Sequence, residues 1–393
     1  MQNWKMVCDR GIINTGNLYR FAKVMQRAKA GEKLKIGFIG GSITQGSLAT
    51  QQDRCYAYLV YSWWKEQFAQ AEFEYINAGI GATTSQFAVA RIESDLLRYE
   101  PDVVFLEFSV NDTDNDFFKE TFEGVVRKIL TSASEPALFM FNNVQYNDGV
   151  NAQRVHNAIG TAYDLPIVSM KNSIYEEIVA GNIAAAEITP DNLHPNDKGH
   201  RMVADVICNL LSEIRTKTEG LKLAEETDSA DAMATNAAAN TYLAPYQMPE
   251  QPVTPNRYIN SKRYQNQNMP QEKRSGFTPD TREQYGVADI FKNGYTACEQ
   301  GAYLETTVEC SRLAVQFRRT ITQPAPIAKA VVDGNEDAAV VLDGNFDETW
   351  GDCIYLKDIA TDLPYGTHTL RIELTKVPEQ MANDFYFISV ITA

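Results

Sequence analysis

Three side chains have the types and spacing that acyl-transfer chemistry requires. Ser42 lies in a glycine-rich turn, residues 40–46, directly after an apolar stretch. Glycines permit a sharp turn there, and a serine at the carboxyl end of a parallel strand faces the crevice where such folds bind ligands. Asp191 precedes His194 by three residues in one loop. The carboxylate can then accept the Nδ1–H of the ring, which leaves Nε2 free to take the serine proton. This combination predicts a Ser-His-Asp triad.

Each of these signals also has a simpler interpretation. A glycine-rich turn after a strand can hold a nucleotide phosphate or be only a turn, while Asp191 and His194 could be a turn aspartate and a helix-entry histidine. The other three of the four histidines are weaker candidates for the general base. His156 lies in a helical pattern, where it packs or faces solvent. His200 lies inside the last helix, and His368 alternates within a strand pattern.

Two more strand ends carry groups that could bind an oxyanion. Gly79 ends one strand pattern and Asn111 follows the next. A glycine lets its backbone N–H approach a ligand closely, and an asparagine presents a side-chain amide. Together with the Ser42 N–H they would supply three donors. Taken singly, each is equally an ordinary turn residue.

Several charged residues have a structural interpretation instead. Asp112, Asp114 and Asp116 form an acidic stretch, but a calcium loop needs a fuller ligand pattern with a late bidentate glutamate. We interpret these aspartates as a solvated loop with helix-entry caps. Arg91 and Asp95 are spaced four residues apart, which predicts a pair that braces a helix.

Short apolar runs alternate with amphipathic stretches over residues 34–217. The runs predict strands at 34–40, 73–77, 102–108, 136–141 and 165–168. The periodic stretches predict helices at 17–30, 56–68, 85–97, 117–130, 150–163 and 196–215. Strands that alternate with helices imply an α/β fold with a mostly parallel sheet covered on both faces.

Taken together, these residues and phrases resemble the SGNH (GDSL-type) hydrolase superfamily. Ser42 matches its first block, Gly79 its second, Asn111 its third, and Asp191 with His194 its fifth. The resemblance covers about residues 34–217. It is strengthened by the phrases Asn77-Ala-Gly-Ile-Gly81, Pro101-Asp-Val-Val-Phe105, Val110-Asn-Asp112 and Leu193-His-Pro-Asn-Asp-Lys-Gly-His200.

One position departs from the pattern of this superfamily. The usual Gly-Asp-Ser-Leu reads Gly40-Gly41-Ser42-Ile43 here, so the acidic residue before the nucleophile is absent. The resemblance implies a three-layer α/β/α sandwich with a flavodoxin-like strand order and no metal or organic cofactor. The Gly40-Gly-Ser-Ile-Thr44 form, followed by a β-rich segment, looks like two-domain carbohydrate O-acetylesterases, among which the mannan acetylesterases are most similar.

The sequence pattern changes after residue 217. We expect a catalytic domain over residues 1–217, and an acidic, alanine-rich linker or mobile loop over 218–240. From 241 to 393, short β-branched runs alternate with turn residues, which predicts a β-sandwich or jelly roll of carbohydrate-binding type. Trp350 is the only tryptophan there. It could stack on a sugar, although a buried tryptophan is the commoner case.

The composition disfavours some classes of binding partner. The 393 residues include 36 Lys plus Arg and 51 Asp plus Glu, a net charge of −15. That field repels nucleic acid and anionic membrane surfaces, whereas a neutral glycan is compatible with it. No apolar run approaches the roughly 20 residues that span a bilayer, the N-terminus resembles no signal peptide, and the six cysteines form no CxxC pair. We therefore expect a cytoplasmic protein, a monomer or homodimer.

Three functions remain at this stage. The first is a serine esterase that removes O-acetyl groups from plant-type oligo- or polysaccharides, most of all acetylated manno-oligosaccharides. The second is another SGNH acyl-ester hydrolase, such as a lysophospholipase or thioesterase. The third is a non-catalytic glycan-binding protein on a hydrolase scaffold. A nucleotide-binding function is weaker, because no acidic ribose partner is evident after the second strand.

Overall fold

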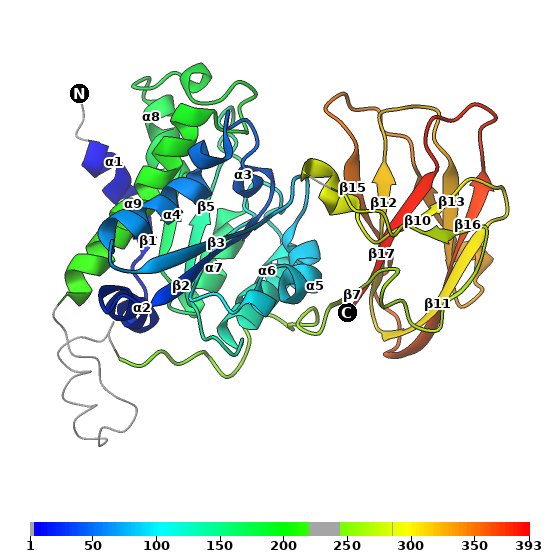
Figure 1. The fold of residues 1–393 in the computed structure, drawn as a ribbon, viewed down its shortest axis with the longest axis horizontal. Coiled ribbons are helices and arrows are strands. Elements are labelled where there is room, and N and C mark those ends of the chain that lie inside the picture. Colours follow the sequence, from blue (N-terminus) through cyan, green and yellow to red (C-terminus); the bar gives the residue numbers. More distant parts are fainter. Residues whose placement is uncertain (1–3, 220–243, 285) are drawn as a thin grey trace. The chain divides into compact units, whose positions relative to one another are not determined.

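The computed structural model describes residues 4–219, 244–284 and 286–393, and the ribbon divides into two compact units (Figure 1). The first unit extends to Ile259 and the second begins at Asn260. Apart from residues 218 and 219, the predicted linker at 218–240 lies outside the described residues.

A six-stranded sheet forms the centre of the first unit. Its order is β1-β6-β5-β4-β2-β3, and β2 to β6 pair in parallel. Counted by themselves in chain order, these five strands have the order 2-1-3-4-5, the flavodoxin-like order that was predicted. The strands are β1 (Ile12–Asn14), β2 (Lys33–Gly40), β3 (Glu72–Gly79), β4 (Val103–Glu107), β5 (Ala137–Asn142) and β6 (Ile167–Ser169).

Strand β1 was not predicted. It has only three residues and pairs antiparallel with β6 at the edge of the sheet. Three residues are too few to show a periodic pattern, and only the long-range pairing defines them as a strand.

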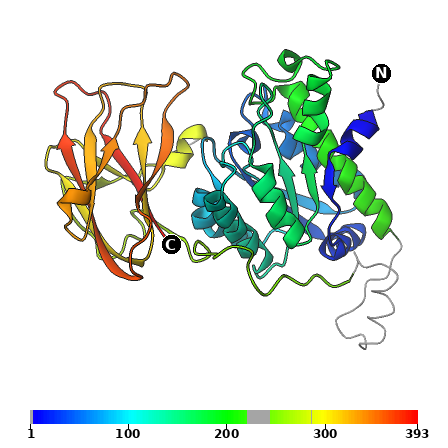
Figure 2. The same cartoon turned by 180° about the vertical axis from the view of Figure 1, so that it is seen from behind.

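Helices cover both faces of the sheet. On one side α1, α2 and α4 contact α9, and on the other α6 contacts both α5 and α7. Figures 1 and 2 view these two groups from opposite sides. The predicted three-layer α/β/α arrangement is therefore confirmed. The helices are α1 (Trp4–Arg10), α2 (Tyr19–Lys29), α3 (Ser42–Gln45), α4 (Tyr56–Gln67), α5 (Ser85–Asp95), α6 (Asp116–Leu130), α7 (Gln153–Ala162), α8 (Glu176–Val179) and α9 (Asp197–Thr218).

The second unit is all β, as predicted. One sheet has the order β15-β12-β17-β10-β9, with β7 also paired to β17, and the other has the order β14-β13-β16-β11-β8. The named strands pair antiparallel and share one apolar core. They are β7 (Lys262–Tyr264), β8 (Lys273–Ser275), β9 (Thr278–Pro279), β10 (Tyr295–Ala297), β11 (Tyr303–Cys310), β12 (Leu313–Arg319), β13 (Ile327–Val332), β14 (Val340–Asp343), β15 (Cys353–Ala360), β16 (Gly366–Lys376) and β17 (Phe385–Thr392).

The boundary between the units differs from the predicted one. Residues 244–259, here called the strap, belong to the first unit rather than to a β-domain that begins at 241. The strap forms no helix or strand, so no periodicity marks where it belongs. Its place is decided by tertiary contacts, with α6 and also between Tyr246 and Tyr163.

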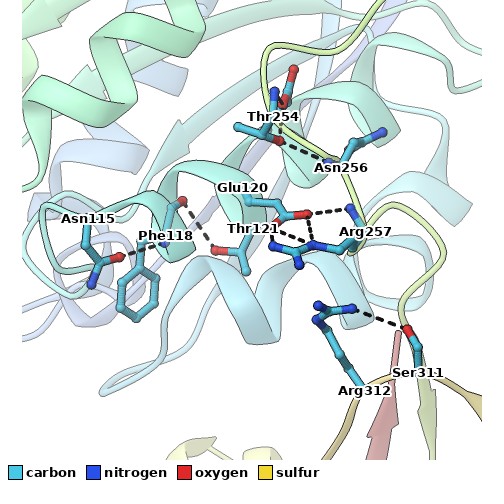
Figure 3. Close-up of polar contacts among 10 residues, drawn as sticks. Asn115, Phe118, Glu120, Thr121, Thr254, Asn256, Arg257, Ser311 and Arg312 are labelled. Atoms are coloured by element: carbon cyan, nitrogen blue, oxygen red, sulfur yellow. Dashed lines mark hydrogen bonds and ion pairs between the residues drawn. The ribbon is translucent and has the colours of Figure 1, made fainter. Parts of the chain in front are cut away.

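Two buried carboxylates of α6 hold the strap. Glu123 accepts the backbone N–H groups of Val253 at 2.6 Å and Thr254 at 2.8 Å. Glu120 accepts the Arg257 N–H at 2.6 Å and pairs with its guanidinium at 2.7 Å (Figure 3). A buried carboxylate is costly unless donors surround it, so the strap completes the first unit.

Candidate active site

Ser42 lies at the tight turn that joins β2 to α3. The strand ends at Gly40, Ser42 opens α3, and Gly46 ends this helix with a φ of 101°, in the left-handed region that glycine tolerates. A Cβ on Gly40 would collide with the Thr44 side chain and with the carbonyl oxygen of Glu107. The glycines therefore allow a turn close enough to the sheet to place Ser42 at the carboxyl edge of β2.

The three predicted triad side chains come together in one chain of hydrogen bonds. Ser42 Oγ lies 2.8 Å from His194 Nε2. His194 Nδ1 lies 2.7 Å from Asp191 Oδ2. With Nδ1–H donated to the carboxylate, Nε2 is the ring nitrogen that can accept the serine proton.

The loop around Asp191 keeps its carboxylate ionised. Oδ1 accepts the backbone N–H groups of Leu193 at 2.9 Å and His194 at 2.7 Å. Partial burial acts to raise the pKa of Asp191, but the hydrogen bonds from the His194 ring and from these two N–H groups outweigh it. The net pKa lies below the ordinary value. An ionised carboxylate is the form that can orient the His194 ring.

Gly79 lies against the turn that carries Ser42, but its N–H has a partner. The amide donates to Asn77 Oδ1 at 2.9 Å. A Cβ at Gly79 would collide with the backbone nitrogen of Gln45 in α3. A glycine is therefore required here for close packing of β3 against α3, whatever else its N–H does.

Asn111 lies beside Gly41, the residue that precedes Ser42. A Cβ on Gly41 would collide with Asn111 Oδ1. A side chain at position 41 would therefore compete with Asn111 for the same space in this structure, and the chain has glycine there. Asn111 Oδ1 is buried and has no hydrogen-bond partner among the described residues.

Comparison with known proteins places this site in a family. A profile of the GDSL-like lipase/acylhydrolase family matches residues 38–202. A solved two-domain esterase active on acetylated mannans, crystallised with mannopentaose, is 47% identical over 98% of this chain and 97% of its own, with a TM-score of 0.89. The chain belongs to the GDSL-like lipase/acylhydrolase family. It is a carboxylic ester hydrolase.

Two further relatives of this GDSL-like hydrolase differ in how much of the chain they match. A second structure of a two-domain esterase active on acetylated mannans is also 47% identical, covers 98% of both chains and has a TM-score of 0.88. Thioesterase 1/protease 1/lysophospholipase L1 of Escherichia coli (strain K12) is 24% identical over 197 residues, 48% of this chain and 87% of its own.

The acidic stretch after Asn111 was partly misinterpreted. Asp112 is not solvated: its side chain is fully buried and lies 3.0 Å from His156 Nε2. Its partner is 44 residues away in the sequence, so no local pattern predicted the pair. The one available signal was its position directly after Asn111 in a family motif.

Arg91 does more than brace its helix. It bonds Asp95 at 3.0 Å, as predicted. It is also fully buried and donates to the Gly40 carbonyl oxygen at 3.4 Å. The guanidinium thus links α5 of the GDSL-like hydrolase to the end of β2, directly before the turn that carries Ser42.

Trp350 is the one predicted site residue in the second unit. Its side chain lies in a loop, is 59% exposed and packs edge-on against Phe346 with a centroid distance of 5.1 Å. A buried tryptophan is therefore excluded, and an exposed aromatic surface remains.

Within residues 4–219, 244–284 and 286–393, no group of three or more His, Cys, Asp or Glu side chains could hold a metal ion. Over the same residues, no helix is long and apolar enough to cross a bilayer.

Proposed function

We propose that this GDSL-like hydrolase removes O-acetyl groups from oligo- or polysaccharides, with acetylated manno-oligosaccharides as its substrate class. The observation that carries the proposal is the hydrogen-bonded chain from Ser42 through His194 to Asp191, in a protein similar over nearly its whole length to an esterase active on acetylated mannans.

Ser42 is the proposed nucleophile. Its Oγ attacks the acetyl carbonyl carbon while His194 Nε2 takes the hydroxyl proton. As the tetrahedral intermediate collapses, His194 gives this proton to the departing sugar oxygen, and an acetyl-Ser42 ester remains. Water, deprotonated by His194, attacks that ester, and His194 returns the proton to Ser42 Oγ as the acyl–oxygen bond breaks and acetate leaves. Asp191 orients the ring and stabilises its cationic form in both halves.

The three donors of the proposed oxyanion hole differ in whether they already have a hydrogen-bond partner. The Ser42 N–H opens α3, where the first N–H groups of a helix lack partners within it. Asn111 contributes its side-chain amide from beside Gly41. The Gly79 N–H would have to share or leave its bond to Asn77 Oδ1. We therefore assign the larger part to the Ser42 N–H and Asn111, each typically worth about 100- to 1000-fold in turnover.

The glycan assignment rests on three features. The two-domain esterase active on acetylated mannans covers both units of this chain. A neutral polysaccharide is not repelled by a net charge of −15. Trp350 presents an exposed ring of the kind that stacks on sugar faces, and we propose that it contacts the glycan.

A thioesterase or lysophospholipase activity is the second candidate. It is favoured by the similarity to the Escherichia coli enzyme of that name. That similarity covers 48% of this chain, so it does not account for the second unit.

The deciding experiment measures acetate release from acetylated mannan and xylan oligosaccharides, next to a small aryl acetate and a long-chain acyl ester. We expect release from acetylated mannan fragments by the wild type and a loss of about a million-fold in Ser42→Ala. Trp350→Ala should lower kcat/KM on the oligosaccharide more than on the aryl acetate.

Three outcomes would contradict parts of this proposal. Turnover of the long-chain ester alone would favour the second candidate. Turnover that survives in folded Ser42→Ala would remove Ser42 as the nucleophile. Equal losses on both acetates in Trp350→Ala would contradict its contact with the glycan.

A further inference from the structure

A second aspartate–histidine pair includes Asp112, the residue that follows Asn111 in the chain. Asp112 Oδ2 is 3.0 Å from His156 Nε2, and both side chains are fully buried. No nucleophilic side chain is bonded to this pair, and His156 Nδ1 has no hydrogen-bond partner among the described residues. The pair therefore has the composition of a catalytic dyad without access to a substrate.

The pair joins three elements of the first unit. Asp112 Oδ1 accepts the backbone N–H of Ser85, the first residue of α5, at 2.9 Å. His156 lies in α7, and its ring stacks on Phe122 of α6 with centroids 3.7 Å apart and planes at 11°. The Ser85 hydroxyl is in turn 2.6 Å from the Thr121 hydroxyl of α6. Asp112 is thus fixed from α5 and α7 at once.

Asn111 depends on this anchor for its own place. The N–H groups of Asn111 and Asp112 both donate to the Phe108 carbonyl oxygen, at 3.0 and 2.9 Å. The side-chain oxygen of Asn111 has no hydrogen-bond partner among the described residues. Its orientation is therefore set by this backbone turn and by contact with Gly41.

We propose that Asp112 and His156 are positioning residues, which hold the Asn111 side chain where it can donate to the oxyanion. The inference rests on the proposed function, because it presumes that role for Asn111. A misplacement of about 1 Å in such a group can cost about 100-fold in rate. A buried carboxylate with two fixed donors is a stiff support, since a lost donor leaves a charge unpaired.

The test is a double-mutant cycle on the full chain, with kcat and KM measured on a small aryl acetate. His156→Phe keeps a ring against Phe122 but removes the N–H that Asp112 accepts. His156→Gln keeps an N–H donor and is the matched control. We expect His156→Phe to lower kcat about 10- to 100-fold with KM changed less than about threefold, and His156→Gln to lose no more than about threefold in kcat.

The Asn111→Ala background separates positioning from general stability. There, His156→Phe should change kcat by less than about twofold, because no side-chain amide remains to be positioned. An equal loss of kcat in both backgrounds would overturn the proposal, as would a folded His156→Gln that fails as badly as His156→Phe. An Asn111→Ala variant with wild-type kcat would overturn it too.

Two controls keep the result interpretable. If circular dichroism shows that His156→Phe does not fold, the cycle is run with Asp112→Asn. We then expect about a 3- to 10-fold loss with Asn111 present and none without it, and equal losses overturn the proposal. Ser42→Ala is measured in the same assay. Full activity of Ser42→Ala would refute the proposed function. An inactive Ser42→Ala together with additive effects of the two substitutions in the cycle would refute only the positioning role.

Discussion

The Asp191–His194 loop and the Asp112–His156 pair use the same two side chains in opposite surroundings. At the first, the His194 side chain is 23% and the Asp191 side chain 44% exposed, and Ser42 Oγ is bonded to the ring. At the second, both side chains are buried, and the histidine contacts Phe122 instead of a nucleophile. An aspartate–histidine pair alone is therefore not sufficient for proton transfer to a substrate. The pair also needs exposure to the substrate and a serine hydroxyl bonded to the ring.

A third aspartate–histidine pair, Asp333 and His368, lies in the second unit and differs in that both ring nitrogens face acceptors. His368 Nδ1 lies 2.7 Å from Asp333 Oδ2, and Nε2 lies 2.8 Å from the Pro364 carbonyl oxygen. Two acceptors favour a ring protonated on both nitrogens, and they raise the pKa of His368, the bond to Asp333 more than the bond to Pro364. Below its raised pKa, His368 is therefore charged and forms an ion pair with Asp333.

The largest expected effect on kcat comes from a substitution in the Asp191–His194 pair. Asp191→Asn should lower kcat about 10,000-fold, because the amide no longer selects the ring tautomer that leaves Nε2 free for the serine proton. The measurement is kcat on a small aryl acetate, with the thermal midpoint as a check on folding. A loss below about tenfold in a folded variant would contradict the proposed role of Asp191.

The same substitution in the buried pair should cost far less. Asp112→Asn still offers an oxygen to the Ser85 N–H, and its amide can donate to His156 in the other tautomer. We expect about a 3- to 10-fold loss of kcat, because neutral hydrogen bonds are about half as strong as charge-assisted ones. Steady-state kinetics at saturating substrate measure it. A loss as large as that of Asp191→Asn would mean that the buried pair takes part in proton transfer.

The smallest effect on activity is expected at the third pair, where the change is in stability. A raised histidine pKa contributes stability that is complete below the unfolded pKa, about 6.5, and is lost as the pH rises through the folded pKa. Asp333, whose pKa is lowered, contributes above its unfolded pKa of about 3.9 and loses this contribution as the pH falls through its folded value.

His368→Gln tests this assignment. The thermal midpoint of the variant should fall below that of the wild type most near pH 5, and the difference should shrink on the alkaline side. Thermal unfolding across pH measures it, with kcat on the aryl acetate expected within about twofold of the wild type. A difference that grows with rising pH would contradict the assigned charge state.

Local pattern was sufficient for much of the active site. The serine turn, with its glycines at 40 and 46, and the loop from 191 to 194 each need only a few consecutive residues, so spacing predicted their geometry. Apolar runs predicted β2, β4, β5 and β6, because buried parallel strands leave a continuous hydrophobic signal. The predicted β3 is the edge strand of the sheet and is mostly half-buried. The family resemblance added the positions of Gly79 and Asn111.

What the tertiary structure alone decided involves partners far apart in the chain. Asp112 is buried because His156, 44 residues away, meets it. The strap belongs to the first unit because Glu123 binds Thr254, 131 residues away. Periodicity reports which face of an element is buried, whereas the identity of the group that meets it is set only when the whole chain has folded.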